Sequence, residues 1–143
     1  MSATTDDFVA QLRQLGFESE LRPNEFVVFD YEVELGRHIG EIVKLGLQVP
    51  PDWPMSPPSG PFVSPRLLPI SGGITGRGRP WDAVHTANDR GLADPDGVWE
   101  YWSRPFTAWP KTDRSVRAYL RHLRTLFDEI KPAVDDGDQA QAA

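Results

Sequence analysis

Residues 26–65 read FVVFDYEVELGRHIGEIVKLGLQVPPDWPMSPPSGPFVSP, and this stretch carries most of the sheet signal in the chain. Apolar and acidic side chains alternate along residues 30–35, which is the period of a strand with one buried face. A turn at residues 36–40, with a glycine at each end, leads to a second alternating run over residues 41–49. Two such runs joined by a short turn predict an antiparallel hairpin whose first strand has an acidic outer face.

A proline-dense segment, residues 49–58, follows the hairpin. Proline has no N–H to donate to a strand ladder and fixes its own φ angle, so the chain has to leave the sheet along a stiff path. The next apolar run, residues 60–65, is predicted to return to the sheet as a further strand. With a short strand at residues 17–21, these segments predict a four-stranded antiparallel meander.

The composition indicates one domain of ordinary size. Of the 143 residues, 1–133 are predicted to form a single domain, and 134–143 a disordered tail. The formal net charge of −6 argues against general nucleic-acid binding. No apolar run approaches the ~18 residues of a membrane span, and the N-terminus lacks the regions of a signal peptide. We therefore expect a cytoplasmic protein with no nucleic-acid or membrane partner.

The chain contains no cysteine, which excludes disulfides, thiolate metal ligands and thiol nucleophiles for this sequence. Its three histidines, His38, His85 and His122, lack the close spacing of metal ligands, so no metal site is predicted. His38 and His122 are expected to face solvent. The glycine-rich residues 71–80 lack the Gly-Lys-Ser/Thr ending of a phosphate loop, and no cofactor is predicted.

A helix is predicted near each end of the domain. At the N-terminus, Thr4 or Thr5 is placed to cap a helix in which Phe8, Leu12 and Leu15 share one face. The acidic residues that follow the threonines favour the positive end of that helix. The predicted order is therefore a helix, then the meander, then a final helix.

The final helix has the clearest pattern in the sequence. Thr112 is expected to cap it, and apolar residues recur at spacings of three and four: Val116, Tyr119, Leu120, Leu123, Leu126, Phe127 and Ile130. A second face carries arginines at similar spacings: Arg114, Arg117, Arg121 and Arg124. A charged stripe is usually a solvated face, and this interpretation is favoured. The alternative is a docking surface for an acidic partner, for which Arg117 and Arg121 are the candidates.

Residues 98–110 are rich in aromatic side chains and include three of the five tryptophans: Trp99, Trp102 and Trp109. Aromatic density of this kind either seals a core or forms a partner surface. Aromatic residues are first of all core material, so a lid between the sheet and the last helix is favoured. In the alternative, these tryptophans and Arg104 bind a protein partner.

The candidate general base is His85, which has Asp82 three residues before it and Asp89 four after it. A carboxylate that orients an imidazole prepares it to accept a proton. Hydroxyl groups that such a base could activate lie in the same part of the chain: Ser71, Thr75, Thr86 and Ser103. Serine and threonine are common in loops, so chance proximity is the favoured explanation.

The order of helix, meander and proline-rich crossing resembles the ubiquitin-conjugating (E2, UBC-fold) family. The motif residues that carry the resemblance are Gly40, the strand to Val49, Pro50, Trp53-Pro54, Pro57-Pro58 and Phe62. The resemblance extends to the final helix. It implies an α+β, UBC-like fold with an N-terminal helix, a four-stranded antiparallel meander, an irregular region rich in proline, glycine and tryptophan, and a C-terminal helix.

Two catalytic features of the E2 family are missing. Ser64-Pro65-Arg66 stands where the family has His-Pro-Asn, and no cysteine lies near Ser71 to Thr75, where the family has its nucleophile. A serine hydroxyl is a far weaker nucleophile than a thiolate at neutral pH. The usual thioester chemistry is therefore not available to this chain.

The second half of the chain looks like prokaryotic E2-like families encoded beside E1-like, JAB peptidase and ubiquitin-like proteins, on the residues Trp99, Trp102-Ser103-Arg104, Trp109-Pro110 and Asp113. Some members of those families lack the cysteine. The resemblance implies a bacterial adaptor, in a system of the antiviral-defence type, whose partners are an E1-like protein and a ubiquitin-like protein. Two alternatives stay open: a transferase that forms an oxyester through Ser71, Thr75 or Ser103 with His85 as base, and a chain whose catalytic cysteine has been replaced.

Overall fold

The computed structural model describes residues 2–68, 70 and 84–129. Its main elements are, in order, α1 (Ala3–Gln14), β1 (Ser19–Arg22), β2 (Phe26–Glu32), β3 (Ile42–Gln48), β4 (Ser59–Ser64), β5 (Val84–Thr86), β6 (Glu100–Trp102) and α2 (Val116–Glu129). Short 3-10 turns lie at Asn88–Arg90 and Trp109–Lys111. The tail predicted at residues 134–143 falls outside the described residues. Neither helix in the described part is long and apolar enough to cross a membrane.

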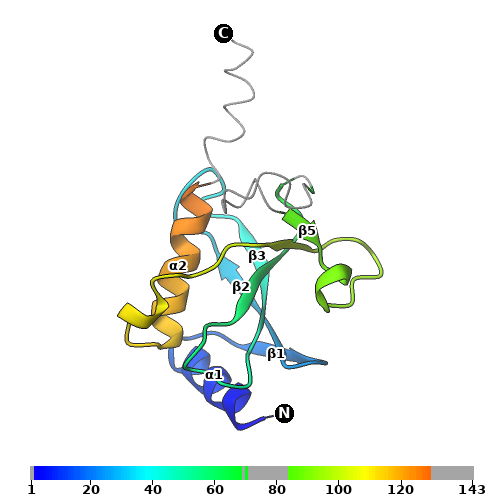
Figure 1. The fold of residues 1–143 in the computed structure, drawn as a ribbon. Coiled ribbons are helices and arrows are strands. Elements are labelled where there is room, and N and C mark those ends of the chain that lie inside the picture. The colour runs from blue at the N-terminus through cyan, green and yellow to red at the C-terminus, as the bar shows by residue number, and fades with distance from the viewer. Residues whose placement is uncertain (1, 69, 71–83, 130–143) are drawn as a thin grey trace.

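The strands form one antiparallel sheet in the order β1-β2-β3-β4-β6-β5 (Figure 1). The first four strands form the predicted meander, in which β2 and β3 pair from Phe26 opposite Gln48 to Glu32 opposite Ile42. The prediction of four strands was wrong, because β6 pairs with β4 and β5 pairs with β6. These two strands have 3 residues each, which is too short for an alternating pattern to be recognised.

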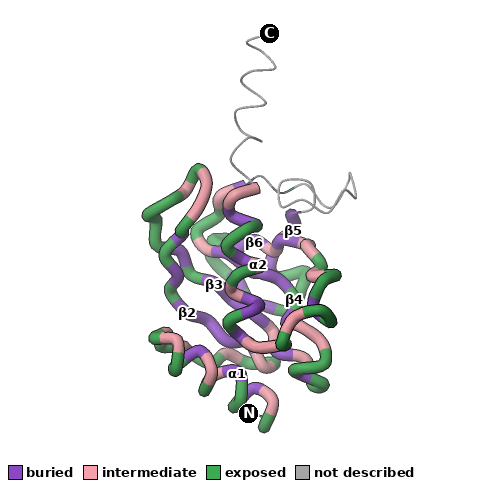
Figure 2. Tube along the Cα trace, turned by 90° about the vertical axis from the view of Figure 1, so that its left-hand side faces the viewer, coloured by how far each residue is buried: buried purple, intermediate pink, exposed green. Residues whose placement is uncertain are grey.

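Both helices cover the same face of the sheet (Figures 1 and 2). Phe8 and Leu12 of α1 share one buried core with Leu123 and Phe127 of α2 and with every second residue of β2 and β3. We call this the helix-side core. The alternation predicted for the hairpin is thereby confirmed, and so is the apolar face predicted for the last helix from Val116 to Phe127. Its last predicted member, Ile130, lies outside the described residues.

A smaller core lies on the opposite face of the sheet, under the segment that links β5 to β6. We call it the outer core, and its buried members are Phe26, Val28, Phe62, Ala87, Leu92 and Trp99. Gly46 of β3 is buried beneath it, and a Cβ at that position would lie 3.4 Å from a ring carbon of Trp99. The missing side chain therefore lets the linking segment approach the sheet closely.

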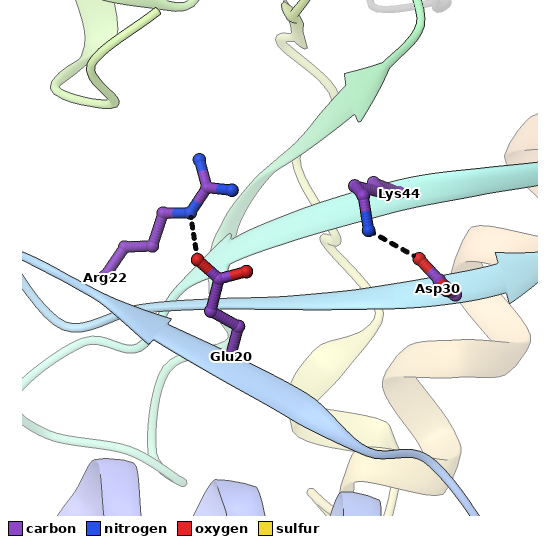
Figure 3. Close-up of polar contacts among 4 residues, drawn as sticks. All are labelled: Glu20, Arg22, Asp30 and Lys44. Carbon is purple, nitrogen blue, oxygen red and sulfur yellow. Dashed lines mark hydrogen bonds and ion pairs between the residues drawn. The ribbon is translucent and has the colours of Figure 1, made fainter.

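The rest of the outer face is charged. Arg22 lies 3.0 Å from Glu20 within β1, and Lys44 of β3 lies 2.9 Å from Asp30 of β2, as Figure 3 shows. Asp30 and Glu32 are exposed, in agreement with the acidic outer face predicted for this strand. The sheet thus has one apolar face and one face that is only partly covered.

The helix starts differ from the predicted ones. α1 is capped by Ser2, whose hydroxyl accepts a hydrogen bond from the N–H of Thr5, and not by Thr4 or Thr5. Before α2, the hydroxyl of Ser115 accepts a hydrogen bond from an N–H of the first turn, so Thr112 is not the cap. Several neighbouring hydroxyl residues could serve as caps, and the path by which the chain enters the helix decides among them.

The proline-rich crossing between β3 and β4 is packed into the molecule. The Trp53 side chain is 3% exposed, and its ring centroid lies 4.9 Å from that of Phe8 and 5.5 Å from that of Trp109. The indole N–H of Trp53 donates to Asp7 of α1 at 2.9 Å, and that of Trp109 donates to the carbonyl of Pro54 at 2.9 Å. The crossing is therefore tied both to α1 and to the segment that precedes α2.

Candidate functional site

β5 and β6 bring two of the predicted catalytic residues to one tyrosine. His85 lies directly opposite Tyr101 in the strand pairing, and their ring centroids are 5.9 Å apart. Ser103 follows β6, and its hydroxyl is close enough to Tyr101 to lower the pKa of that phenol. The third predicted residue, Ser71, and the alternative Thr75 lie outside the described residues. His85 and Ser103 are thus joined through a residue that the sequence did not single out.

Arg90 completes this group, and we call His85, Arg90, Tyr101 and Ser103 the tyrosine cluster. The Arg90 guanidinium carbon lies 5.3 Å from the centre of the Tyr101 ring, and Nη2 donates to Nδ1 of His85 at 3.2 Å. Desolvation, followed by the cationic Arg90, lowers the pKa of His85. Burial raises the pKa of Tyr101, although Arg90 and Ser103 act in the opposite direction. At neutral pH the imidazole is therefore uncharged and the phenol keeps its proton.

The carboxylate predicted to orient His85 has a different partner. Asp89 accepts a hydrogen bond from the hydroxyl of Thr86, and it raises the pKa of His85 by less than desolvation and Arg90 lower it. Asp82 lies outside the described residues. Within the described ranges no serine or threonine hydroxyl is hydrogen-bonded to His85, so no nucleophile and base are paired there.

A cavity of about 400 Å³ lies beside the tyrosine cluster. Tyr101, Ser103 and Arg104 line it together with the double proline, Pro57-Pro58. Arg104 also contacts α2, where its Nη2 lies 3.3 Å from a carboxylate oxygen of Glu129. Two sequence features that suggested an E2-like protein, the double proline and the Ser-Arg pair, therefore meet at one surface hollow.

Glu100 is a buried carboxyl group that the sequence patterns did not identify. Its side chain is 0% exposed and accepts hydrogen bonds from the N–H groups of Leu67 at 3.0 Å and Leu68 at 3.2 Å. The indole N–H of Trp102 also donates to it at 2.8 Å. Desolvation raises the pKa of Glu100, although these hydrogen bonds and Arg66 oppose the shift. The one sequence signal for a buried carboxyl was its position as a single acidic residue within the aromatic run of residues 99–102.

These contacts fasten the chain at Leu67 and Leu68, ahead of the segment in which the E2 resemblance predicts a nucleophile. Leu67 and Leu68 follow β4 and lead toward residues 71–75. Arg66 stands where the E2 family has an asparagine, and its Nε donates to the backbone carbonyl of Trp99 at 3.1 Å. In this chain the position therefore holds the backbone together rather than presenting an amide for catalysis.

The tryptophans predicted as a partner surface are core residues. Trp102 is 0% exposed, Trp109 1% and Trp99 4%. Trp102 packs on Phe127 of α2 with ring centroids 5.1 Å apart, whereas Trp99 belongs to the outer core. Trp102 and Trp109 therefore lie where the lid prediction put them, between the sheet and the last helix. The three rings do not form an exposed interface.

The remaining predicted partner-binding residues, Arg117 and Arg121, are exposed on α2. They line a groove of about 570 Å³. The other residues of the groove come from α2, β2 and the segments that follow β2 and α1: Leu15, Phe17, Tyr31, Glu32, Glu34, Leu120 and Arg124. Arg124 is ion-paired with Glu34 at 3.3 Å.

The prediction that His38 and His122 face solvent needs correction. The His122 ring stacks on Phe106 with centroids 4.1 Å apart and an angle of 7°, and its Nε2 is buried without a hydrogen-bond partner in the described structure. Desolvation, followed by Arg104, lowers the pKa of His122 to about 4. His38 is half-buried, with its Nδ1 3.0 Å from Glu41. Across residues 2–68, 70 and 84–129, no group of histidine and acidic residues is arranged to hold a metal ion.

Comparisons of the chain with family models, with curated proteins and with solved structures found no match. The resemblance to E2 proteins consequently rests on the motif residues and on the order of the elements.

Proposed function

We propose that this chain is an E2-like adaptor that binds an E1-like or a ubiquitin-like protein of a bacterial modification system. The proposal keeps the UBC-like identity suggested by the sequence motif. It is supported by the order of α1, the β1–β4 meander, the proline-rich crossing and the final α2. The extra strands β5 and β6 extend that meander at its β4 edge.

The packed crossing between β3 and β4 carries the proposal. A proline-rich loop with an aromatic-proline pair was the most specific element of the resemblance. In this chain that pair, Trp53-Pro54, is held by Asp7 of α1 and by Trp109. These contacts give the motif a structural role, because they join the N-terminal helix, the sheet and the chain before α2.

Binding without group transfer fits the chemistry of the chain better than a conjugation reaction. No thiol is present in the sequence. In the described residues, the candidate base His85 contacts Arg90, and the candidate nucleophile Ser103 contacts Tyr101. A hydroxyl that has no base beside it stays protonated at neutral pH and attacks esters and thioesters slowly.

One observation favours the second candidate, an oxyester-forming transferase. Ser103 and Arg104 line a hollow next to Tyr101, and Tyr101 lies opposite His85 in the pairing of β5 with β6. A partner that displaced Arg90 from the imidazole would free a neutral base near this hydroxyl. The experiment below separates this reaction from simple binding.

The test incubates the purified chain with a neighbouring E1-like protein, the ubiquitin-like protein and ATP. Intact mass and denaturing gels are read with and without hydroxylamine, and co-elution is read by size exclusion. The adaptor predicts a stable complex with one of the two proteins and no covalent adduct. Neither a complex nor an adduct would overturn the proposed function.

A base-labile adduct of one ubiquitin-like unit would instead support the transferase. In that case Ser103→Ala should abolish the adduct, and Thr107→Ala, in the same hollow, is the matched control. An adduct that survives Ser103→Ala but is lost in Ser71→Ala or Thr75→Ala would move the nucleophile to the segment before β5.

A further inference from the structure

The groove between α2 and β2 has features of a binding site that neither the sheet nor the tyrosine cluster accounts for. Its volume is about 570 Å³, and its walls differ in chemistry. One wall is the arginine stripe of α2, and the other contains two glutamates of the β2 end, Glu32 and Glu34. Partly buried apolar side chains form the base: Leu15, Phe17 and Leu120.

The charges of the two walls do not cancel. Arg124 and Glu34 neutralise each other at 3.3 Å, at one end of the groove. Arg117 and Arg121 form no ion pair with another described residue, although Arg121 is close enough to Asp113 to lower the pKa of that carboxyl. Glu32 is the remaining acid in the lining. The groove therefore has a positive end at Arg117 and Arg121 on a chain whose net charge is −6.

The base of the groove can hold an apolar side chain. Phe17 packs edge-on against Phe29 with ring centroids 5.3 Å apart, which fixes one side of the base. Tyr31 also lines the groove, and its hydroxyl is buried with no hydrogen-bond partner among the described residues.

We infer that this groove binds an acidic peptide segment of a protein partner, with an apolar side chain against Phe17 and Leu120 and carboxylates at Arg117 and Arg121. Guanidinium groups bind carboxylates with two parallel hydrogen bonds, and α2 presents them one turn apart. A nucleic acid is a poorer occupant, because it carries a phosphate at every nucleotide and would place charge against Glu32, whereas a peptide can present neutral residues there. The inference rests on the proposed function only for the identity of the partner.

The test uses a short fluorescein-labelled peptide in which a leucine is flanked by aspartates and glutamates. Its affinity for the full chain is measured by fluorescence anisotropy at low salt. The Arg117→Glu/Arg121→Glu variant is expected to bind roughly tenfold more weakly or worse, which corresponds to at least about 1.4 kcal/mol. Both residues are exposed on α2, and Arg117 lies in its first turn, where glutamate suits the helix dipole, so the variant should fold.

The matched control is Arg22→Glu/Lys44→Glu, which makes the same charge change on the opposite face of the sheet (Figure 3). Its affinity should stay within about twofold of wild type, because screened surface charges act weakly over such a separation. Leu120→Asp should weaken binding as well, since it removes part of the apolar base. A peptide with asparagine and glutamine in place of its acids should bind several-fold more weakly.

Three results would overturn the inference: no binding of the acidic peptide to wild type, equal binding by the Arg117→Glu/Arg121→Glu and Arg22→Glu/Lys44→Glu variants, or equal binding of the acidic and neutral peptides. No E1-like or ubiquitin-like protein is used, so these results are independent of the adaptor test. If the peptide binds but the adaptor test yields no complex with an E1-like or ubiquitin-like protein, the groove is supported as a peptide-binding site and the proposed adaptor function is contradicted.

Discussion

The two faces of the sheet are built differently. On one face, α1 and α2 bury a continuous core that runs from Phe8 to Phe127. On the other face, the segment between β5 and β6 covers only a small outer core around Trp99, and ion pairs occupy the rest. Because apolar burial is the main favourable term in folding, the helix side should carry most of the stability.

This difference also separates the candidate sites. The tyrosine cluster lies on the outer face, because His85 and Tyr101 alternate with Val84 and Trp102, which point into the helix-side core. The groove lined by Arg117 and Arg121 lies at the margin of the helix side. The tyrosine cluster therefore lies on the more thinly covered face, where side chains can change with less loss of stability.

The largest expected effect compares a tryptophan from each face. Trp102→Ala should lower the free energy of unfolding by about 5 kcal/mol. The substitution removes a fully buried ring that packs on Phe127, and it removes the hydrogen bond that the indole N–H donates to Glu100. Trp99→Ala should cost about 3 kcal/mol, since the outer core is small. Urea denaturation measures both. Equal losses would show that the thin cover contributes as much as the helices, and an unchanged Trp102→Ala protein would revive the interface interpretation.

The second prediction concerns the buried carboxylate that links the sheet to the loop after β4. Glu100→Leu should lower the free energy of unfolding by about 3 kcal/mol, because the N–H groups of Leu67 and Leu68 and the Trp102 indole lose their acceptor. Glu100→Gln keeps one acceptor oxygen and should lose less. The same urea curves test this, and a leucine variant as stable as wild type would exclude an anchoring role.

The third prediction is a pH dependence from His122. Its folded pKa, about 4, is below the unfolded value of 6.5, so its contribution is fully present above pH 6.5 and is lost as pH falls through 4. Between pH 7 and pH 5 this loss amounts to about 2 kcal/mol. His122→Phe, which keeps a ring for Phe106 to stack on, should lose less stability over that interval. Parallel pH curves for the two proteins would contradict the assignment.

The smallest effect is expected for the exposed ion pair between Asp30 and Lys44 (Figure 3). Both side chains are more than half exposed, so a double-mutant cycle with alanine should give a coupling of about 0.5 kcal/mol or less. Salt should reduce this coupling further. A coupling as large as the loss in Glu100→Leu would mean that the charged face is a structural part of the fold and not a solvated surface.

Much of the fold could be predicted because its signals are local. The alternation around Tyr31 and Val43 and the three- and four-residue spacing in α2 are periods of single elements, and single elements need no knowledge of their neighbours. The candidate site was predicted only in part. His85 and Ser103 were named, but Tyr101 and Arg90, which join and restrain them, were not.

The N-terminal helix, the hairpin, the proline-rich crossing, the final helix and the absence of a thiol follow from the sequence alone. The last two strands, the packing of the crossing around Trp53, the burial of His122 and the partners of Glu100 are set by the tertiary structure. Those features depend on residues far apart in the chain, such as Glu100 and Leu67, which are 33 positions apart. The path of the intervening chain sets such contacts, and no local pattern of side chains encodes it.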